Sequence, residues 1–436
     1  MIFADFQSLD LTGPFEVFAG ANQRLGRAAY ELTTVATTAG PVHSNSGLTI
    51  TADRSINDIK PGDVDTLIVA GGTGVLLAKD DGQLMAWIAT VSKRCKRVVS
   101  ICTGTFLLAA AGVVVDERVT THWAYADKLG RDYPALTVDP DPIFIRNDKV
   151  WTSAGVTAGI DLALAIVEED HGADIAQVAA RWLVMFLRRP GGQSQFAASV
   201  WAEPAARVRA PHRRFTIGLS PSIRDGYFRQ DQRMTTYGIL AFPNVEELDA
   251  VGPWEIFGAS KMVHENDGQP GDNVFLIAET ATPIRCNKGL HVVPDFTFQN
   301  HPHLDVVLVP GGFGTRAEVD NPVLIEWLQT VAANATWVTS VCTGSLLLHG
   351  AGIAKDKRVA THHGFEDQLE ARGNITVVRG ERWVVDGNVV SSQGVSAGID
   401  MALWLIGQID SPGHARAVQH YIQYDPAPPY QDLIGA

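Results

Sequence analysis

Apolar and polar residues follow two recurring patterns along this 436-residue chain. Short runs rich in Val, Ile and Leu predict buried strands, and longer stretches with apolar residues three or four positions apart predict helices. Because the two patterns alternate, we expect parallel sheets covered by helices, an α/β fold. In the first half the predicted strands are 2–6, 31–37, 65–70, 97–101 and 150–153, and the predicted helices are 13–26, 80–94, 103–111 and 157–169.

The second half of the chain repeats the first. Residues 9–18 resemble 248–257, and residues 155–161 resemble 394–400, at a nearly constant distance of about 240 residues. Both halves also contain a short hairpin pattern, near 143–151 and 381–390. The strands of the second half are predicted at 236–242, 273–279, 304–309, 336–341 and 388–392. The chain is therefore predicted to be a tandem duplication of one α/β fold.

The repeat divides the chain into a first domain, 1–205, and a second domain, 234–436. Residues 206–233 contain seven arginines and two aspartates, and we expect an exposed basic linker; a docking strip for an acidic surface is the alternative. The second copy has several residues before its first strand that the first copy lacks. The first strand of the first copy is therefore expected to be clipped, either because it is short or because Met1 is not the true start.

A cysteine follows a β-branched run in each copy and precedes a Thr-Gly pair that opens a helix. These are Cys102 and Cys342, in V-V-S-I-C-T-G and V-T-S-V-C-T-G. A strand–turn–helix elbow strains its central residue and lifts the side chain clear of the sheet. The start of the helix favours a thiolate, so both cysteines are candidate nucleophiles, although a buried cysteine is ordinarily a small core residue. Cys95 and Cys286 have no duplicate and are expected to be structural.

Two carboxylates and two glycine pairs recur with the elbows. Asp10 and Asp249 are expected at the end of the first strand, near the elbow, where a carboxyl group can transfer protons to and from the thiol. A helix N-cap is the alternative role for these acids. The pairs Gly71-Gly72 and Gly311-Gly312 follow apolar strands, and their amides are predicted to approach the substrate, unless they form plain tight turns.

Other polar residues recur in both copies, but the sequence indicates a functional role for them less strongly. Thr103 and Thr343 follow the cysteines and are candidates to orient a bound group. His122 and His362 suggest Cys-His pairs, but their position beyond the elbow helix favours a structural or rim histidine. Glu16 and Glu255 are weaker site candidates, and Asp161 and Asp400 are expected to be structural.

Composition narrows the function. The net charge of −13 argues against a general nucleic-acid binder. No apolar run is long enough to span a membrane, and the first residues lack a signal-peptide pattern. Four cysteines do not form a disulfide framework, so a reduced, cytoplasmic protein is expected. We expect a small-molecule substrate.

Together these motifs resemble the DJ-1/PfpI superfamily over nearly the whole chain, twice. The resemblance implies two flavodoxin-like, three-layer α/β/α sandwiches with mainly parallel sheets. It rests on L-D-x-x-G-P-x-E, the Gly-Gly turn, the S-x-C-T-G elbow and A-G-I-D. Cys-Thr-Gly, rather than Cys-His-Gly, separates the chain from the protease-like branch of the superfamily.

The second copy is most similar to the isocyanide (isonitrile) hydratase branch, a similarity that includes the terminal run 423–430. That resemblance implies attack of Cys342 on an isocyanide carbon, a thioimidate, proton transfer by Asp249, substrate positioning by Thr343 and release of an N-substituted formamide. It implies no metal or organic cofactor. His363, where tryptophan is usual, and the run Ser392-Gln393-Gly394 depart from that branch and bear on substrate fit.

The first copy resembles the amidase-like sensor domains of AraC-type regulators, through residues 188–196. A second copy follows it instead of a helix-turn-helix domain, so nucleic acid is not an expected partner. Superfamily members commonly pair, and the two copies are expected to form an intramolecular pseudo-dimer, with a homo-oligomer as the alternative. A ligand or redox sensor, and another thiol activity such as amide hydrolysis or glyoxal hydration, are the alternatives to isocyanide hydration.

Overall fold

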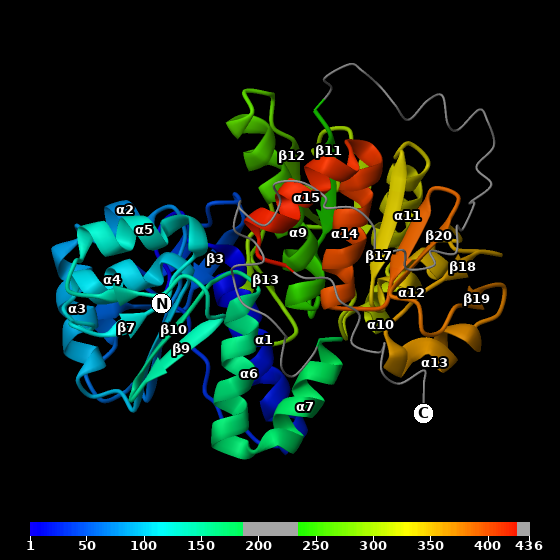
Figure 1. Ribbon diagram of the computed structural model, residues 1–436. Coiled ribbons are helices and arrows are strands. Elements are labelled where there is room, and N and C mark those ends of the chain that lie inside the picture. Colours follow the sequence, from blue (N-terminus) through cyan, green and yellow to red (C-terminus); the bar gives the residue numbers. More distant parts are fainter. Residues whose placement is uncertain (186–233, 425–436) are drawn as a thin grey trace, which may run out of the picture.

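The computed structural model describes residues 1–185 and 234–424, which form two α/β units called copy 1 and copy 2 (Figure 1). Copy 1 comprises the described residues up to 185, and copy 2 those from 234. The predicted linker, 206–233, and the runs 188–196 and 425–430 lie outside the described residues. Each unit has helices on both sides of a mostly parallel sheet, so the predicted α/β class and the duplication are confirmed.

Copy 2 has the complete sheet. Five predicted strands form there, and an antiparallel hairpin, 383–392, closes one edge. The sheet order is β15 (Phe296–Thr297), β12 (Asn273–Ala278), β11 (Thr236–Leu240), β16 (Val306–Val309), β17 (Trp337–Val341), β21 (Val389–Ser392) and β20 (Trp383–Asp386). Helices α9 (Glu247–Asn266) and α14 (Ser396–Ile409) pack together on one face, and α11 (Pro322–Ala332) and α12 (Gly344–Gly350) cover the other.

In copy 1 the sheet is divided. One part has the order β5 (Thr66–Val69), β6 (Arg97–Ile101), β10 (Val150–Ser153) and β9 (Phe144–Asn147), and the other pairs β1 (Val35–Ala36) with β4 (Arg54–Ser55). Between them, the Ile2 amide donates to the Val35 carbonyl at 2.8 Å and the Met1 carbonyl accepts from Ala70 at 3.2 Å. The strand predicted at 2–6 is wrong, because the chain turns at Ala4-Asp5 after these two bonds.

The first helix of each copy begins earlier than its sequence suggests. Helix α1 (Ser8–Leu25) was predicted from residue 13, and it continues through Pro14 as α9 continues through Pro253. A proline removes one backbone donor without necessarily ending a helix when neighbouring packing holds it. Asp10 and Asp249 therefore lie in the first helical turn, not at the end of a strand.

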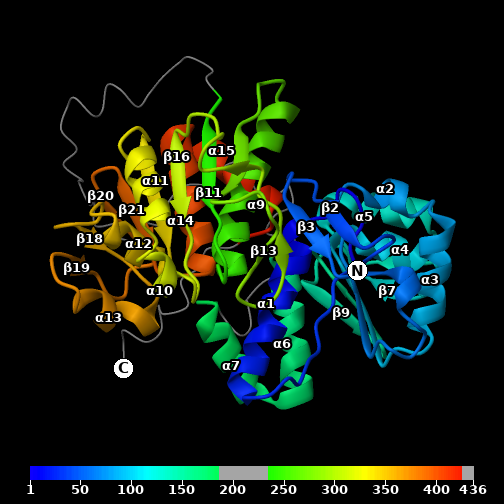
Figure 2. The same ribbon diagram turned by 180° about the vertical axis from the view of Figure 1, so that it is seen from behind.

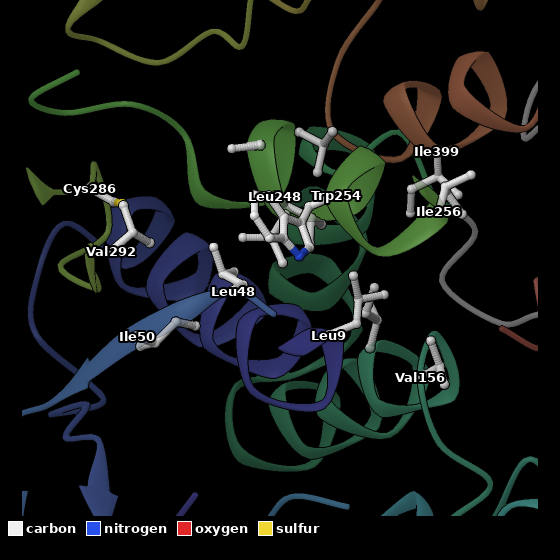
Figure 3. Close-up of a cluster of buried hydrophobic side chains, with 14 of the residues drawn as sticks. Leu9, Leu48, Ile50, Val156, Leu248, Trp254, Ile256, Cys286, Val292 and Ile399 are labelled. Atoms are coloured by element: carbon white, nitrogen blue, oxygen red, sulfur yellow. The ribbon is translucent and has the colours of Figure 1, made fainter. Parts of the chain in front are cut away.

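The two copies pack through α1 and α9, and α6 (Ala158–His171) packs against α1 as α14 packs against α9 (Figures 1 and 2). Figure 3 shows the apolar centre of this contact, where Trp254 of copy 2 lies near Leu9 and Leu48 of copy 1. The buried Trp254 indole donates to the carbonyl of Ser46 at 3.2 Å. The centre of this interface is therefore apolar, and the indole N–H that enters it has a hydrogen-bond partner.

A four-stranded antiparallel sheet also crosses the boundary between the copies. Strands β2 (Gly40–His43) and β3 (Thr49–Ala52) come from copy 1, and β13 (Ile284–Arg285) and β14 (His291–Val292) come from copy 2. The two hairpins meet where Ile50 pairs with Val292. None of the described helices is long and apolar enough to cross a membrane.

A buried charge group, here called the interface ion cluster, joins α1 to copy 2 and consists of Glu16, Glu246, Glu247 and Lys288. The Lys288 Nζ lies 3.3 Å from Glu246 and 3.6 Å from Glu16, and its side chain is 1% exposed. Burial, followed by the charge of Glu246, raises the pKa of Glu16, whereas the pKa of Glu246 is lowered because its bond to Glu16 and the charge of Lys288 outweigh its burial. Glu255 is the equivalent of Glu16 in the other half of the interface. The residues around it that correspond to the other three members of the cluster are uncharged, namely Gln7, Ser8 and Ser46.

We predict that Lys288→Ala strongly destabilises the protein. Removing the lysine leaves a buried carboxylate without its cation, which costs about 3–5 kcal/mol in comparable sites. Urea unfolding should show this loss of unfolding free energy, whereas the exposed-site control Lys355→Ala should change it by less than about 0.5 kcal/mol. Equal stability of the two variants would contradict the assignment of Lys288 as the counter-ion of the cluster.

Candidate active site

Both elbow cysteines have the backbone conformation that the sequence predicted. Cys102 has a φ of 56° and Cys342 a φ of 58°, in the left-handed region where a side chain is strained. Each lies between a buried strand, β6 or β17, and a helix, α4 (Thr105–Ala110) or α12. The carbonyl of Cys342 accepts from the Thr361 hydroxyl at 2.9 Å, as that of Cys102 does from Thr121 at 2.8 Å. The surrounding fold thus fixes both elbows.

The two aspartates lie beside the elbows, held by amides from two distant segments. The Asp249 carboxylate accepts from Gly311 at 3.1 Å and from Val395 at 2.8 Å. The Asp10 carboxylate accepts from Gly71 at 2.9 Å and from Val156 at 2.8 Å. Neither aspartate caps its helix, because the N-cap positions are Gln7 and Glu246. Both carboxyl groups are therefore directed into the site.

The glycine pairs support these side chains. The amide of Gly312 donates to the Thr343 hydroxyl at 3.0 Å, and that of Gly72 donates to Thr103 at 2.9 Å. Since the amides of Gly71 and Gly311 are bonded to the aspartates, all four glycine amides are occupied by the protein. Direct contact of these glycines with substrate stays a prediction, and their visible role is to position the carboxyl and hydroxyl groups.

Burial controls the protonation of the site. It raises the pKa of Asp249 to about 7 and that of Asp10 to about 8, against the amide bonds that favour the carboxylate. Burial, with the charge of Asp249, also raises the pKa of the Cys342 thiol well above its ordinary value. The thiolate predicted from the helix start is therefore wrong for the resting site, because desolvation outweighs the amide of Thr343.

The two copies differ in how the thiol is bound. In copy 2 the side chain that interacts with the Cys342 thiol is the Asp249 carboxyl group, whereas in copy 1 the side chain that interacts with the Cys102 thiol is the Thr103 hydroxyl. A thiol donating to a carboxylate of near-neutral pKa can pass its proton to that carboxylate as the sulfur reacts. Copy 2 therefore has the arrangement of a nucleophile and its base, without a resting thiolate.

The histidines cap helical turns. The Nδ1 of His122 accepts from the Ala124 amide at 3.3 Å, which leaves its Nε2 to donate to the Tyr421 carbonyl at 3.2 Å. The Nδ1 of His362 likewise accepts from Gly364 at 3.1 Å. Burial lowers the pKa of both imidazoles to about 4. The structural role favoured by the sequence thus agrees with their positions, and neither is arranged as the base of a Cys-His pair.

The model of the DJ-1/PfpI family matches residues 1–169 and 237–408. This chain belongs to the DJ-1/PfpI family. The isonitrile hydratase of Pseudomonas putida is 37% identical over 193 residues, which are 44% of this chain and 80% of that enzyme. The transcriptional regulator CdhR of Pseudomonas aeruginosa is 32% identical over 151 residues, which are 35% of this chain and 44% of the regulator. A THiJ/PfpI family protein from Pseudomonas syringae has 28% identity and a TM-score of 0.41, over 50% of this chain and 86% of that structure.

In this DJ-1/PfpI chain each copy also contacts the segment beside the other copy's site. The Ser396 hydroxyl of copy 2 donates to the Val184 carbonyl of copy 1 at 2.7 Å, and the Thr157 hydroxyl of copy 1 donates to the Gln423 carbonyl of copy 2 at 2.9 Å. Trp182 of copy 1 also lies 4.5 Å from the ring of His362. Residues near the end of the described part of each copy therefore lie beside the valine whose amide holds the aspartate of the other copy.

The sequence also gave no indication of the roles of Val156 and Val395. Their φ angles are 49° and 46°, which are unusual for β-branched residues, and their amides hold the aspartates. Val395 lies in the repeated segment 394–400, which ends at Asp400. The repetition was visible, but a valine amide is not recognisable as a site group from its residue type.

The structure also shows where the remaining residues with a predicted role lie. Glu16 and Glu255 lie in the interface rather than beside the sulfur atoms, and Asp400 pairs with Arg382. Asp161 is buried in α6, and Cys95 and Cys286 are buried free cysteines. These placements fit the structural roles that the sequence favoured for the last four residues.

We predict that Gly311→Ala damages the site and lowers stability. A Cβ atom there would lie 2.6 Å from the Thr343 amide nitrogen and 2.8 Å from the Asp249 carboxylate, where little can move. Overpacking of this kind costs about 1–3 kcal/mol, measurable by urea unfolding. Gly20→Ala in α1 is the control, because its Cβ meets nothing within 4 Å and should leave stability equal or higher. A Gly311→Ala protein as stable as the control would contradict the close packing inferred here.

Proposed function

We propose that copy 2 is a cysteine-dependent hydratase that converts an isocyanide into an N-substituted formamide. The observation that supports it most is the interaction of the Cys342 thiol with Asp249, a buried carboxyl group with a pKa of about 7. The similarity to the P. putida isonitrile hydratase supports the choice of substrate. The enzyme class proposed is a hydro-lyase.

In the first step the Cys342 sulfur attacks the terminal carbon of R–N≡C. The thiol proton passes to the Asp249 carboxylate and from there to that carbon, giving the thioimidate R–N=CH–S–Cys342. A neutral thiol suffices, because the proton leaves as the carbon–sulfur bond forms. Thr343 lies beside the sulfur and positions the substrate, and no ionised sulfur has to be buried beforehand.

In the second step water adds to the thioimidate carbon. Asp249, again ionised, takes one proton from the water and passes it to the nitrogen, and the remaining hydroxyl proton of the adduct leaves with the sulfur to restore the thiol. The product is R–NH–CHO, so the sum is one isocyanide plus one water. A carboxyl group with a pKa near neutrality serves both steps, because it exchanges protons in either direction at physiological pH.

Turnover should depend on Cys342 more than on Cys102. Formamide production from a simple isocyanide should fall at least a thousandfold in Cys342→Ala and less than threefold in Cys102→Ala. The reason is that only copy 2 joins its thiol to a carboxylate base. Each variant is the matched control of the other. Unchanged turnover in both would contradict the proposal that a cysteine is the nucleophile.

The activity should also rise with pH through Asp249. Its pKa is about 7, so the ionised form that accepts the thiol proton increases as the pH rises from 6 to 8. We expect kcat/KM to increase over that window and level off above it. In Asp249→Asn the pH dependence should disappear and the rate should fall about 10²–10⁴-fold. A wild-type profile that decreases from pH 6 to 8 would contradict the role of Asp249 as the base.

A ligand-sensing role for copy 1 is the second candidate. The matched regulators favour it, and so does Cys102 itself, whose thiol interacts with the Thr103 hydroxyl. The chain spans about half the length of those regulators, which limits the comparison to part of each protein. If the chain is a sensor throughout, no isocyanide is turned over and oxidation stops at a cysteine sulfinic acid without release of product.

A further inference from the structure

A cation, Arg316, lies beside the Cys342 site, and the residue at the equivalent position of copy 1 is uncharged. Arg316 follows the glycine turn of copy 2, at the position where copy 1 has Leu76. Leu76 packs against the apolar core of copy 1, as a residue of that type is expected to. The duplication therefore preserved the nucleophile and the carboxylate but placed a guanidinium at the edge of one site only.

The Arg316 guanidinium is held next to Thr343, the residue that follows Cys342. Its Nη1 donates to the Gly312 carbonyl at 2.9 Å and lies 3.3 Å from the Thr343 hydroxyl oxygen. Its carbon lies 4.6 Å from the centre of the Phe365 ring and 5.4 Å from that of Phe313. Stacking on aromatic rings and one fixed nitrogen reduce the freedom of the side chain, so it is prepared for a ligand.

Most of the hydrogen-bonding capacity of Arg316 is unused. Within residues 1–185 and 234–424, Nε and Nη2 donate no hydrogen bond, and no carboxylate lies within ion-pair distance of the side chain. The residue is solvent-exposed, and the charge of an ionised Cys342 reaches it. A guanidinium with two free nitrogens on one side matches a carboxylate, which it binds through two parallel hydrogen bonds.

We propose that Arg316 binds a carboxylate group of the substrate that reacts at Cys342. This inference rests on the proposed function for the reacting group, and it defines the substrate as a small isocyanide that also carries a carboxylate. Binding at Arg316 would present the isocyanide carbon to the sulfur, since Arg316 contacts the threonine next to Cys342. Copy 1, with Leu76, has no such preference.

Alkylation tests the carboxylate site without any assumption about hydration. Iodoacetate and iodoacetamide transfer the same carbon to the Cys342 sulfur and release iodide, but only iodoacetate is an anion. In the full chain with Cys102→Ala, peptide mass spectrometry would give the rate of each reagent at Cys342. We expect Arg316→Leu, which copies the copy 1 residue, to lower the iodoacetate-to-iodoacetamide ratio at least tenfold. Any change in thiol pKa cancels in that ratio.

Two variants separate a contact from a general charge effect. Arg316→Lys keeps the charge without the planar fork, so its ratio should lie between those of the wild type and Arg316→Leu. Arg372→Leu removes the same charge from another exposed position of copy 2 and should leave the ratio unchanged. An unchanged ratio in Arg316→Leu, or an equal fall in Arg372→Leu, would overturn the proposal.

Turnover distinguishes the two proposals. With isocyanoacetate and its methyl ester as substrates, Arg316→Leu should lose at least tenfold in kcat/KM for the acid and less than twofold for the ester. If both isocyanides are hydrated with an unchanged preference, hydration stands and the carboxylate site fails. If neither is hydrated but the alkylation ratio falls, the carboxylate site stands and isocyanide hydration fails.

Discussion

The architecture of each site depends on one buried carboxyl group. Asp249 accepts hydrogen bonds from the amides of Gly311, in the turn after β16, and of Val395, before α14, and it lies itself in the first turn of α9. Three segments that are far apart in sequence thus meet at two oxygen atoms, and the elbow of Cys342 lies against them. Burial of that carboxyl group costs free energy, and its amide bonds offset part of the cost. The same burial brings its pKa near neutrality, where proton transfer is useful.

The duplication made two sites with different electrostatics. Around Cys342 are a thiol–carboxylate bond, the interface ion cluster and Arg316; around Cys102 the corresponding positions are mostly uncharged. Because Glu246 contributes to the pKa of both Asp249 and Cys342, the contact between copies reaches the chemistry of copy 2. Identical copies in a symmetric pair would have identical sites, whereas a tandem chain can let them diverge.

Sequence patterns predicted most strands and helices, because burial in a parallel sheet requires continuous apolar runs. They failed at the first helix of each copy, where Gly-Pro suggested a start and the helix in fact begins five residues earlier, at Ser8 in copy 1. They also failed at residues 2–6. Met1 corresponds to Leu240, the last residue of the equivalent strand β11 in copy 2, so residues 2–6 correspond to the turn that follows that strand. In both cases packing against other segments decided what local propensity left open.

The sequence by itself determined the duplication, the two elbows and the residues Asp10, Asp249, Thr103 and Thr343 near them, since repeated polar residues in apolar surroundings stand out without a structure. Only the tertiary structure decided three properties of the sites. These are the pKa shifts of the thiols, the interaction of Cys342 with Asp249, and the contact of each copy with the segment beside the other copy's site. Those properties depend on desolvation and on distances between residues remote in the chain, which residue type and spacing do not contain.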